Sequence, residues 1–255
     1  MLARRVVVCL DVRGARVVKG VRFSGLRDVG DPAELAQRYE REGADEIVFL
    51  DVSASTEERA TVLDVARRTA ERLFIPLTIG GGVRSVDDVA TVLRAGADKV
   101  SMNSAAVQRP DVLREAADRF GAQAVVASID AKRRADGSWE AYTHGGRRPT
   151  GLDAVAWAER CAAIGAGEIL LTSIDRDGTR GGYDVELTQS VARCVAVPVV
   201  ASGGAGEPCH VVDVLRAGAD AALVAGILHD GRTTVDAIKR QMAAHDLLVR
   251  RSSDG

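Results

Sequence analysis

Short, continuous apolar runs alternate along the chain with longer segments whose apolar residues recur every three to four positions. Continuous apolar runs are typical of parallel strands covered on both faces, and the longer segments have the period of amphipathic helices. The runs lie near residues 5–11, 46–52, 75–80, 98–103, 124–130, 168–173, 197–202 and 220–225. The pattern therefore predicts eight parallel strands, most of them separated by helices.

One part of this pattern occurs twice, because residues 76–105 match residues 198–227 without a gap. Both copies contain the run Leu-Arg-Ala-Gly-Ala-Asp, at residues 93–98 and 215–220. Each copy has the pattern of a strand, a glycine-rich turn, a helix and a second strand. A repeat of such a unit half a chain apart favours a closed barrel over an open doubly wound sheet.

These observations predict one α/β domain over residues 1–255, a (βα)8 TIM barrel with a two-fold half-barrel repeat. The half-barrels are expected near residues 1–122 and 123–245, and residues 246–255 are expected to form a flexible tail. Two long connections, residues 12–30 and 132–151, interrupt the alternation of strands and helices. Long loops in compact domains are often lids or binding loops, and a tolerated surface insertion is the alternative interpretation.

Composition and charge narrow the classes of function. The net charge of −2 gives no indication of nucleic acid or an anionic membrane as a partner, and no apolar run approaches the ~20 residues of a membrane span. The four cysteines have no metal or redox spacing, which is typical of reduced thiols in a cytoplasmic protein. The four histidines form no ligand pattern, so we expect no metal, and no motif predicts a cofactor.

Two aspartates stand at corresponding places in the two halves. Asp11 ends the first apolar run, and Asp130 ends the fifth. The active site of a TIM barrel is built at the carboxyl ends of its strands, so these carboxylates would face each other across the mouth. Such a pair can divide the acid and base roles of a reaction. The alternative is that each aspartate only caps the turn that follows it.

Glycine-rich turns also occur twice at strand ends, at residues 80–82 and 202–204. Glycine lets backbone N–H groups approach an anion closely, and the next helix N-terminus adds positive potential. Two symmetric turns of this kind predict a substrate with two phosphates. The first phosphate site is expected at Gly82, Asn103 and Ser104, and the second at Gly203, Gly204, Ala225 and Gly226.

Charged residues occur near the opposite ends of the strands, where the barrel floor is expected. They are Arg5, Glu46, Lys99 and Glu168, which we call the floor ring. Buried charges are costly unless they are paired, and two cations with two anions could form a neutral ring. From spacing alone, a purely stabilising ring is as good an interpretation as a functional one.

Taken together, the motifs resemble the cyclase subunit of imidazole glycerol phosphate synthase, a family of histidine biosynthesis. The resemblance covers residues 1–245. The motifs are CLDV and GARVVKG at 9–20, FLDVSAS at 49–55, IGGGVRS at 79–85, DKVSMNSAAV at 98–107, SIDAKR at 128–133, THGGRRPTG at 143–151, GAGEILLTSIDRDGTRGGYD at 165–184 and ASGGAG at 201–206.

The resemblance implies a lyase that combines ammonia with a bisphosphate, the phosphoribulosyl-formimino aminoimidazole carboxamide ribonucleotide. Ring closure would give imidazole glycerol phosphate and release aminoimidazole carboxamide ribotide. By this resemblance Asp11 and Asp130 match the catalytic pair, and Lys19 lies on a mobile first loop that closes over the substrate. Asp177 and Gly178 join the second phosphate site.

The resemblance also implies a partner, a glutaminase (glutamine amidotransferase) subunit docked at the amino-terminal face of the barrel as a heterodimer. Ammonia from that subunit would pass through the barrel, and the floor ring would be its gate. Two other functions stay open. The sister isomerase of the pathway shares the fold, the phosphate sites and the aspartates, but residues 132–151 and the floor ring favour the cyclase. The second open function is that of a non-catalytic barrel that binds phosphorylated metabolites, and the presence of Asp11 and Asp130 argues against it.

Overall fold

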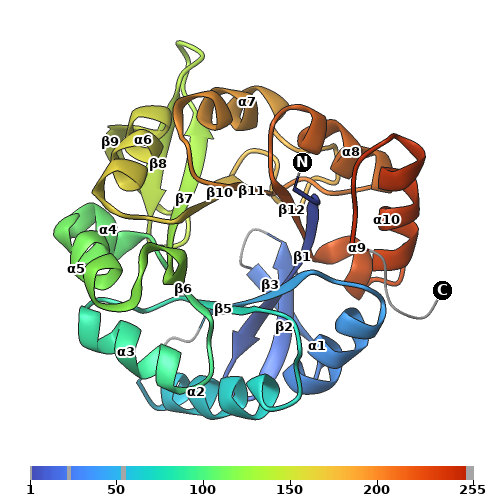
Figure 1. Ribbon diagram of the computed structural model, residues 1–255, viewed down its shortest axis with the longest axis horizontal. Helices are drawn as coiled ribbons and strands as arrows, with labels where there is room; N and C mark the ends of the chain where they lie inside the picture. The colour runs from blue at the N-terminus through green and yellow to red at the C-terminus, as the bar shows by residue number, and fades with distance from the viewer. Residues whose placement is uncertain (1, 22–23, 53–55, 251–255) are drawn as a thin grey trace.

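Within the described residues, eight parallel strands close into a barrel, which confirms the predicted fold (Figure 1). The computed structural model describes residues 2–21, 24–52 and 56–250, and for residues 19–21, 24–27 and 56–60 it describes the backbone alone. The pairing of β12 with β1 closes the sheet. In barrel order the strands are β1 Arg5–Arg13, β4 Glu46–Asp51, β5 Leu77–Gly80, β6 Lys99–Met102, β7 Val125–Arg133, β10 Glu168–Ser173, β11 Val199–Ser202 and β12 Ala221–Val224.

Helices surround the barrel as an outer ring (Figure 1). The first of them shows how the sequence sets a helix start: the Asp31 side chain accepts hydrogen bonds from the N–H groups of Ala33 and Glu34, and Pro32 occupies the first turn. The helices are α1 Pro32–Arg41, α2 Thr56–Ala70, α3 Val86–Arg94, α4 Ser104–Gln108, α5 Asp111–Phe120, α6 Ala154–Ile164, α7 Val185–Cys194, α8 Pro208–Arg216, α9 Gly226–His229 and α10 Val235–Ala244, with a short 3-10 turn, η1, at Ala122–Ala124.

The duplicated segments fold into matching units, β5–α3–β6 and β11–α8–β12. They share a specific interaction at the barrel floor. Asp98 accepts a hydrogen bond from Leu77 N at 2.8 Å, and Asp220 accepts one from Val199 N at 3.0 Å. In each repeat, the aspartate just before the second strand therefore fixes the start of the first strand.

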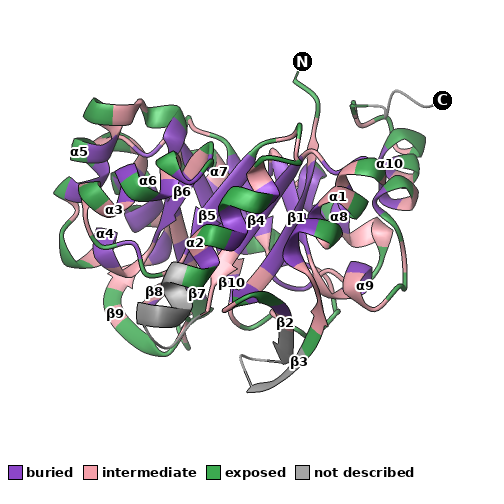
Figure 2. Ribbon diagram, turned by 90° about the horizontal axis from the view of Figure 1, so that it is seen from below, coloured by how far each residue is buried: buried purple, intermediate pink, exposed green. Residues whose placement is uncertain are grey.

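The two long connections are antiparallel ribbons rather than loops. After β1 the chain continues into β2 (Arg16–Val21) and β3 (Ser24–Gly30), and after β7 it continues into β8 (Trp139–Thr143) and β9 (Arg148–Asp153). Both ribbons project from the same end of the barrel, opposite the termini (Figure 2). They rise beside the carboxyl ends of the strands, where the active site is expected.

The expected tail is held against the barrel at its beginning. Arg250 donates to Asp45 from Nε at 2.9 Å, and the Lys239 ammonium donates to the same carboxylate oxygen at 2.6 Å. Lys239 also donates to the Arg250 carbonyl at 3.0 Å. Residues 246–250 are thus attached to the amino-terminal face, and residues 251–255 lie outside the described part. Among the described residues, no helix is long and apolar enough to cross a membrane.

Candidate active site

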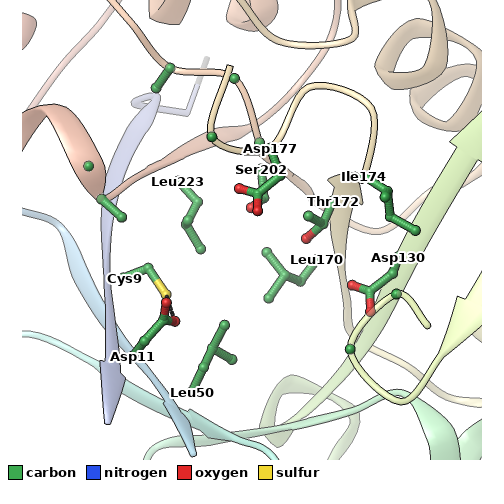
Figure 3. Close-up of a pocket in the computed structure, with 18 of the residues that line it drawn as sticks. Cys9, Asp11, Leu50, Asp130, Leu170, Thr172, Ile174, Asp177, Ser202 and Leu223 are labelled. Carbon is green, nitrogen blue, oxygen red and sulfur yellow. Dashed lines mark hydrogen bonds between the residues drawn. The ribbon is translucent and has the colours of Figure 1, made fainter. Parts of the chain in front are cut away.

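A cavity of about 520 Å³ opens at the carboxyl ends of the strands. Asp11 and Asp130 lie on opposite walls of this cavity, with Leu50, Leu170 and Leu223 around the space between them (Figure 3). Asp11 comes from β1 and Asp130 from β7, as the sequence predicts. Two carboxylates from different strands therefore share one largely apolar chamber.

Each carboxylate has its own hydrogen-bond partner. The Asn103 side-chain amide donates to Oδ2 of Asp130 at 3.0 Å. The Cys9 thiol, 3.7 Å from Oδ1 of Asp11, donates to that carboxylate. The two aspartates thus have different surroundings, which is the arrangement that separates the acid and base members of a pair.

The pKa of Asp130 is raised to about 6, first because the group is buried and second because the Asp177 carboxylate lies nearby. Hydrogen bonds from Gly146 N–H and Asn103 act in the opposite direction, because they stabilise the charged form. Burial also raises the pKa of Asp177, against a bond from Gly178 N–H. Asp130 can therefore exchange a proton close to neutral pH.

Every residue predicted for the second phosphate site lines the cavity. These residues are Asp177, Gly178, Gly203, Gly204, Ala225 and Gly226. Glycine is required at position 203, because its φ is +90° and an added Cβ would lie 2.7 Å from the Ser173 carbonyl oxygen. This close approach brings the turn after β11 against the end of β10.

The residues predicted for the first phosphate site do not line that cavity. Asn103 contacts Asp130, as described above, and Ser104 begins α4. The Ser104 hydroxyl accepts a hydrogen bond from His144 N at 3.1 Å, so the turn between β8 and β9 contacts this site. Gly145, Gly146 and Arg147 of the same turn line the cavity. Lys19 belongs to β2, but its side chain lies outside the described residues.

Sequence reasoning missed several cavity residues. Lys132, Arg147 and Arg180 place cationic side chains at the cavity, where they suit an anionic substrate. All three lie within motifs of the resemblance, Arg147 in THGGRRPTG, Lys132 in SIDAKR and Arg180 in GAGEILLTSIDRDGTRGGYD. His229 also lines the cavity, and a lone histidine on a short helix gives no sequence signal. Among the described residues, no group of histidine, cysteine, aspartate or glutamate side chains is placed to hold a metal ion.

The floor ring forms at the other end of the barrel. Lys99 Nζ lies 2.8 Å from Glu46 and 2.7 Å from Glu168, and Arg5 bonds the same two carboxylates at 3.0 and 2.5 Å. Glu46 is 3% exposed and Glu168 is 5% exposed. Burial lowers the pKa of Arg5, but attraction to Glu168 and Glu46 outweighs it and the net pKa is raised. The ring is therefore closed and fully paired.

Comparison with known proteins decides the family. A family model described as "Histidine biosynthesis protein" matches residues 5–234. Imidazole glycerol phosphate synthase subunit HisF of Myxococcus xanthus (strain DK1622) is 68% identical over 98% of this chain and 99% of that protein. The chain belongs to the HisF family. Two HisF proteins of Synechococcus sp., from strains CC9605 and CC9311, are 56% and 57% identical over 98% of this chain and 100% and 97% of theirs.

Membership of the HisF family confirms the resemblance read from the motifs. The activity is that of the cyclase subunit of imidazole glycerol phosphate synthase, a lyase of histidine biosynthesis, and not that of the sister isomerase or a non-catalytic barrel. The word subunit in these names implies that the HisF relatives work with a partner chain.

Proposed function

We propose that this HisF chain closes the imidazole ring by general acid–base catalysis between Asp11 and Asp130. The substrate is the phosphoribulosyl-formimino aminoimidazole carboxamide ribonucleotide, and ammonia is the second reactant. The products are imidazole glycerol phosphate and aminoimidazole carboxamide ribotide. The observation that carries this proposal is the placement of the two carboxylates on opposite walls of one cavity (Figure 3).

The different surroundings of the two aspartates support a division of roles. With its pKa raised to about 6, Asp130 keeps a proton to higher pH than an ordinary aspartate does, and this suits it to donate. Asp11 lies on the opposite wall, where it can act on the other side of the same substrate. Reacting groups held at fixed places in one cavity avoid the entropic cost of meeting in solution.

The anion-binding features support a bisphosphate substrate. The glycine-rich turns of the second phosphate site line the mouth, where backbone N–H groups can approach an anion. Arg147 adds positive charge there, and Arg180 lines the same cavity while paired with Asp230. The turn at His144 contacts the first phosphate site, so a phosphate there would meet backbone groups of residues 144–146 as well as Ser104. Lys19 belongs to β2 of the ribbon beside the mouth, and we expect it to act in closure over the substrate.

The opposite face supports the proposed glutaminase partner. Phe74 and Leu2 are 94% and 90% exposed, and both precede the start of a barrel strand. A subunit docked at this face would bury both apolar side chains. Ammonia released there would have to pass the closed floor ring, which we therefore propose as the gate. The four free thiols agree with a cytoplasmic location.

The test is turnover of the bisphosphate by the purified chain with an ammonium salt and no partner. We expect aminoimidazole carboxamide ribotide to be released with ammonium, and with glutamine only after a glutaminase subunit is added. Absence of turnover at saturating ammonium and substrate would overturn the proposal.

A further inference from the structure

His229 connects three elements at the cavity. It ends α9, the short helix whose first residue, Gly226, belongs to the second phosphate site. Its Nδ1 lies 2.7 Å from the Tyr39 hydroxyl on α1, and its Nε2 lies 3.1 Å from the Cys9 carbonyl oxygen on β1. The Tyr39 and His229 rings are 5.7 Å apart between centroids, and Tyr39 is fully buried.

The hydrogen-bond directions follow from the chemistry of the partners. A carbonyl oxygen can only accept, so Nε2 carries the hydrogen and donates to Cys9. In the neutral imidazole, Nδ1 then accepts from the Tyr39 hydroxyl. Burial raises the pKa of Tyr39 to about 12, so its hydroxyl keeps its hydrogen at neutral pH. Each ring nitrogen therefore holds a different element.

The bond to Cys9 replaces a missing part of the sheet. Strand β1 pairs with β12 only from Arg5↔Ala221 to Val8↔Val224, because the chain turns into α9 after Val224. On its other edge β1 stays paired with β4 as far as Val12↔Asp51. On this edge β2 pairs with β1 from Val12 onward, and between Val8 and Val12 the Cys9 carbonyl accepts the bond from His229. Asp11 lies two residues beyond this point.

We propose that His229 is a positioning residue, which fixes the end of β1 and thus Asp11 relative to the second phosphate site. The inference rests on the proposed role of Asp11. The second phosphate site and the His229 ring belong to the same turn of chain, so the bond to Cys9 sets the distance between bound phosphate and carboxylate. Loss of the bond should lower kcat more than it changes KM.

Two near-isosteric variants separate the two bonds. His229→Gln can place an amide donor near Nε2 and keeps the bond to Cys9, whereas His229→Asn can place an acceptor near Nδ1 and keeps only the bond to Tyr39. Tyr39→Phe is the matched control, because it removes the Tyr39 bond and leaves the histidine. All three lose one buried hydrogen bond, so their melting temperatures should fall together.

The measurement is kcat and KM with ammonium, beside the melting temperature of each variant. We expect His229→Asn to lose roughly ten- to a hundredfold in kcat, as small displacements of catalytic groups do. Tyr39→Phe should keep a kcat close to that of the parent, and His229→Gln should lose clearly less kcat than His229→Asn. Equal kcat in His229→Asn and His229→Gln, or losses that follow melting temperature, would overturn the inference. Asp11→Asn is run alongside: if it turns over at the parent rate, the assignment of Asp11 fails instead.

Discussion

The side-chain amide of Asn103 donates a hydrogen bond to Oδ2 of Asp130 at 3.0 Å. Asn103 follows the end of β6 in the predicted first phosphate site, and Asp130 lines the cavity from β7. One side chain thus joins a predicted binding site to a predicted catalytic group. We therefore predict that an anion bound at the first site would change the protonation of Asp130 through Asn103.

We predict that two substitutions shift the pKa of Asp130 in opposite directions. Asn103→Ala removes a donor that stabilises the carboxylate, so the pKa should rise above about 6. Asp177→Asn removes a nearby negative charge, so the pKa should fall. The measurement is a pH titration of the Asp130 carboxyl carbon by nuclear magnetic resonance. Shifts in the same direction for both variants would contradict the electrostatic account.

The ionised form of Asp130 should also lower the free energy of unfolding at neutral pH. Its pKa is about 6 in the folded chain and about 3.9 when unfolded, so between these values the folded state binds more protons and stability falls as pH rises. At pH 8 the cost amounts to about 3 kcal/mol. Asp130→Asn should therefore be more stable than the parent at pH 8, by up to that amount, and should gain nothing at pH 4.

The measurement is urea unfolding of Asp130→Asn and the parent at both pH values. Asp136→Asn is a suitable control, because Asp136 is exposed and hydrogen bonds from Ser138 lower its pKa. Asp136→Asn should show no increase in the free energy of unfolding at pH 8. If Asp130→Asn raised the free energy of unfolding equally at pH 4 and pH 8, the charge of Asp130 would not be the cause of the gain.

Two separate phosphate sites should be distinguishable with inorganic phosphate. We predict that Ser104→Asp abolishes binding at the first site and Ala225→Asp abolishes binding at the second, each through charge repulsion. Ser104→Asn and Ala225→Asn, which have the same size without the charge, should retain most binding. Crystals soaked in phosphate give the occupancies. An anion that stays in place beside either new carboxylate would contradict the assignment of that site.

For the floor ring, Lys99→Ala leaves Glu46 and Glu168 with Arg5 as the remaining cation of the ring, which should loosen its closure. The cavity lies at the other end of the barrel, so turnover with free ammonia should change little. Turnover driven by glutamine and a glutaminase subunit should fall, because ammonia would escape or be blocked. Arg4→Ala is the control, since Arg4 pairs with Asp220 on the same face outside the ring. An unchanged ratio of glutamine-driven to ammonia-driven turnover would leave the ring a stabilising feature only.

The barrel could be predicted because parallel strands buried on both sides are continuous apolar runs. Residues 168–173, for example, form β10 as expected. Asp11 and Asp130 could be predicted because they end such runs at corresponding places. The Asp136-Gly137 pair predicts the hairpin turn that joins β7 to β8. The rest of the ribbons could not be predicted, because β8 alternates buried and half-buried residues over only five positions.

Other parts of the site depend on contacts between distant segments. The bond from His144 to Ser104 and the bonds of His229 join residues far apart in the chain. A single polar side chain on a short helix has no periodicity, so its partner follows only from tertiary packing. The raised pKa of Asp130 is similar, because it arises from burial and from Asp177 on another strand's loop.

Turnover by Asp11→Asn and Asp130→Asn with ammonium tests the central claim most directly. Each variant should keep its fold and substrate binding while kcat falls ~10²–10⁴-fold, the usual contribution of general acid–base catalysis. Circular dichroism and equilibrium binding of the bisphosphate confirm that the fold and the binding are intact. Parent-level kcat in both variants would contradict the assignment of Asp11 and Asp130 as the catalytic pair.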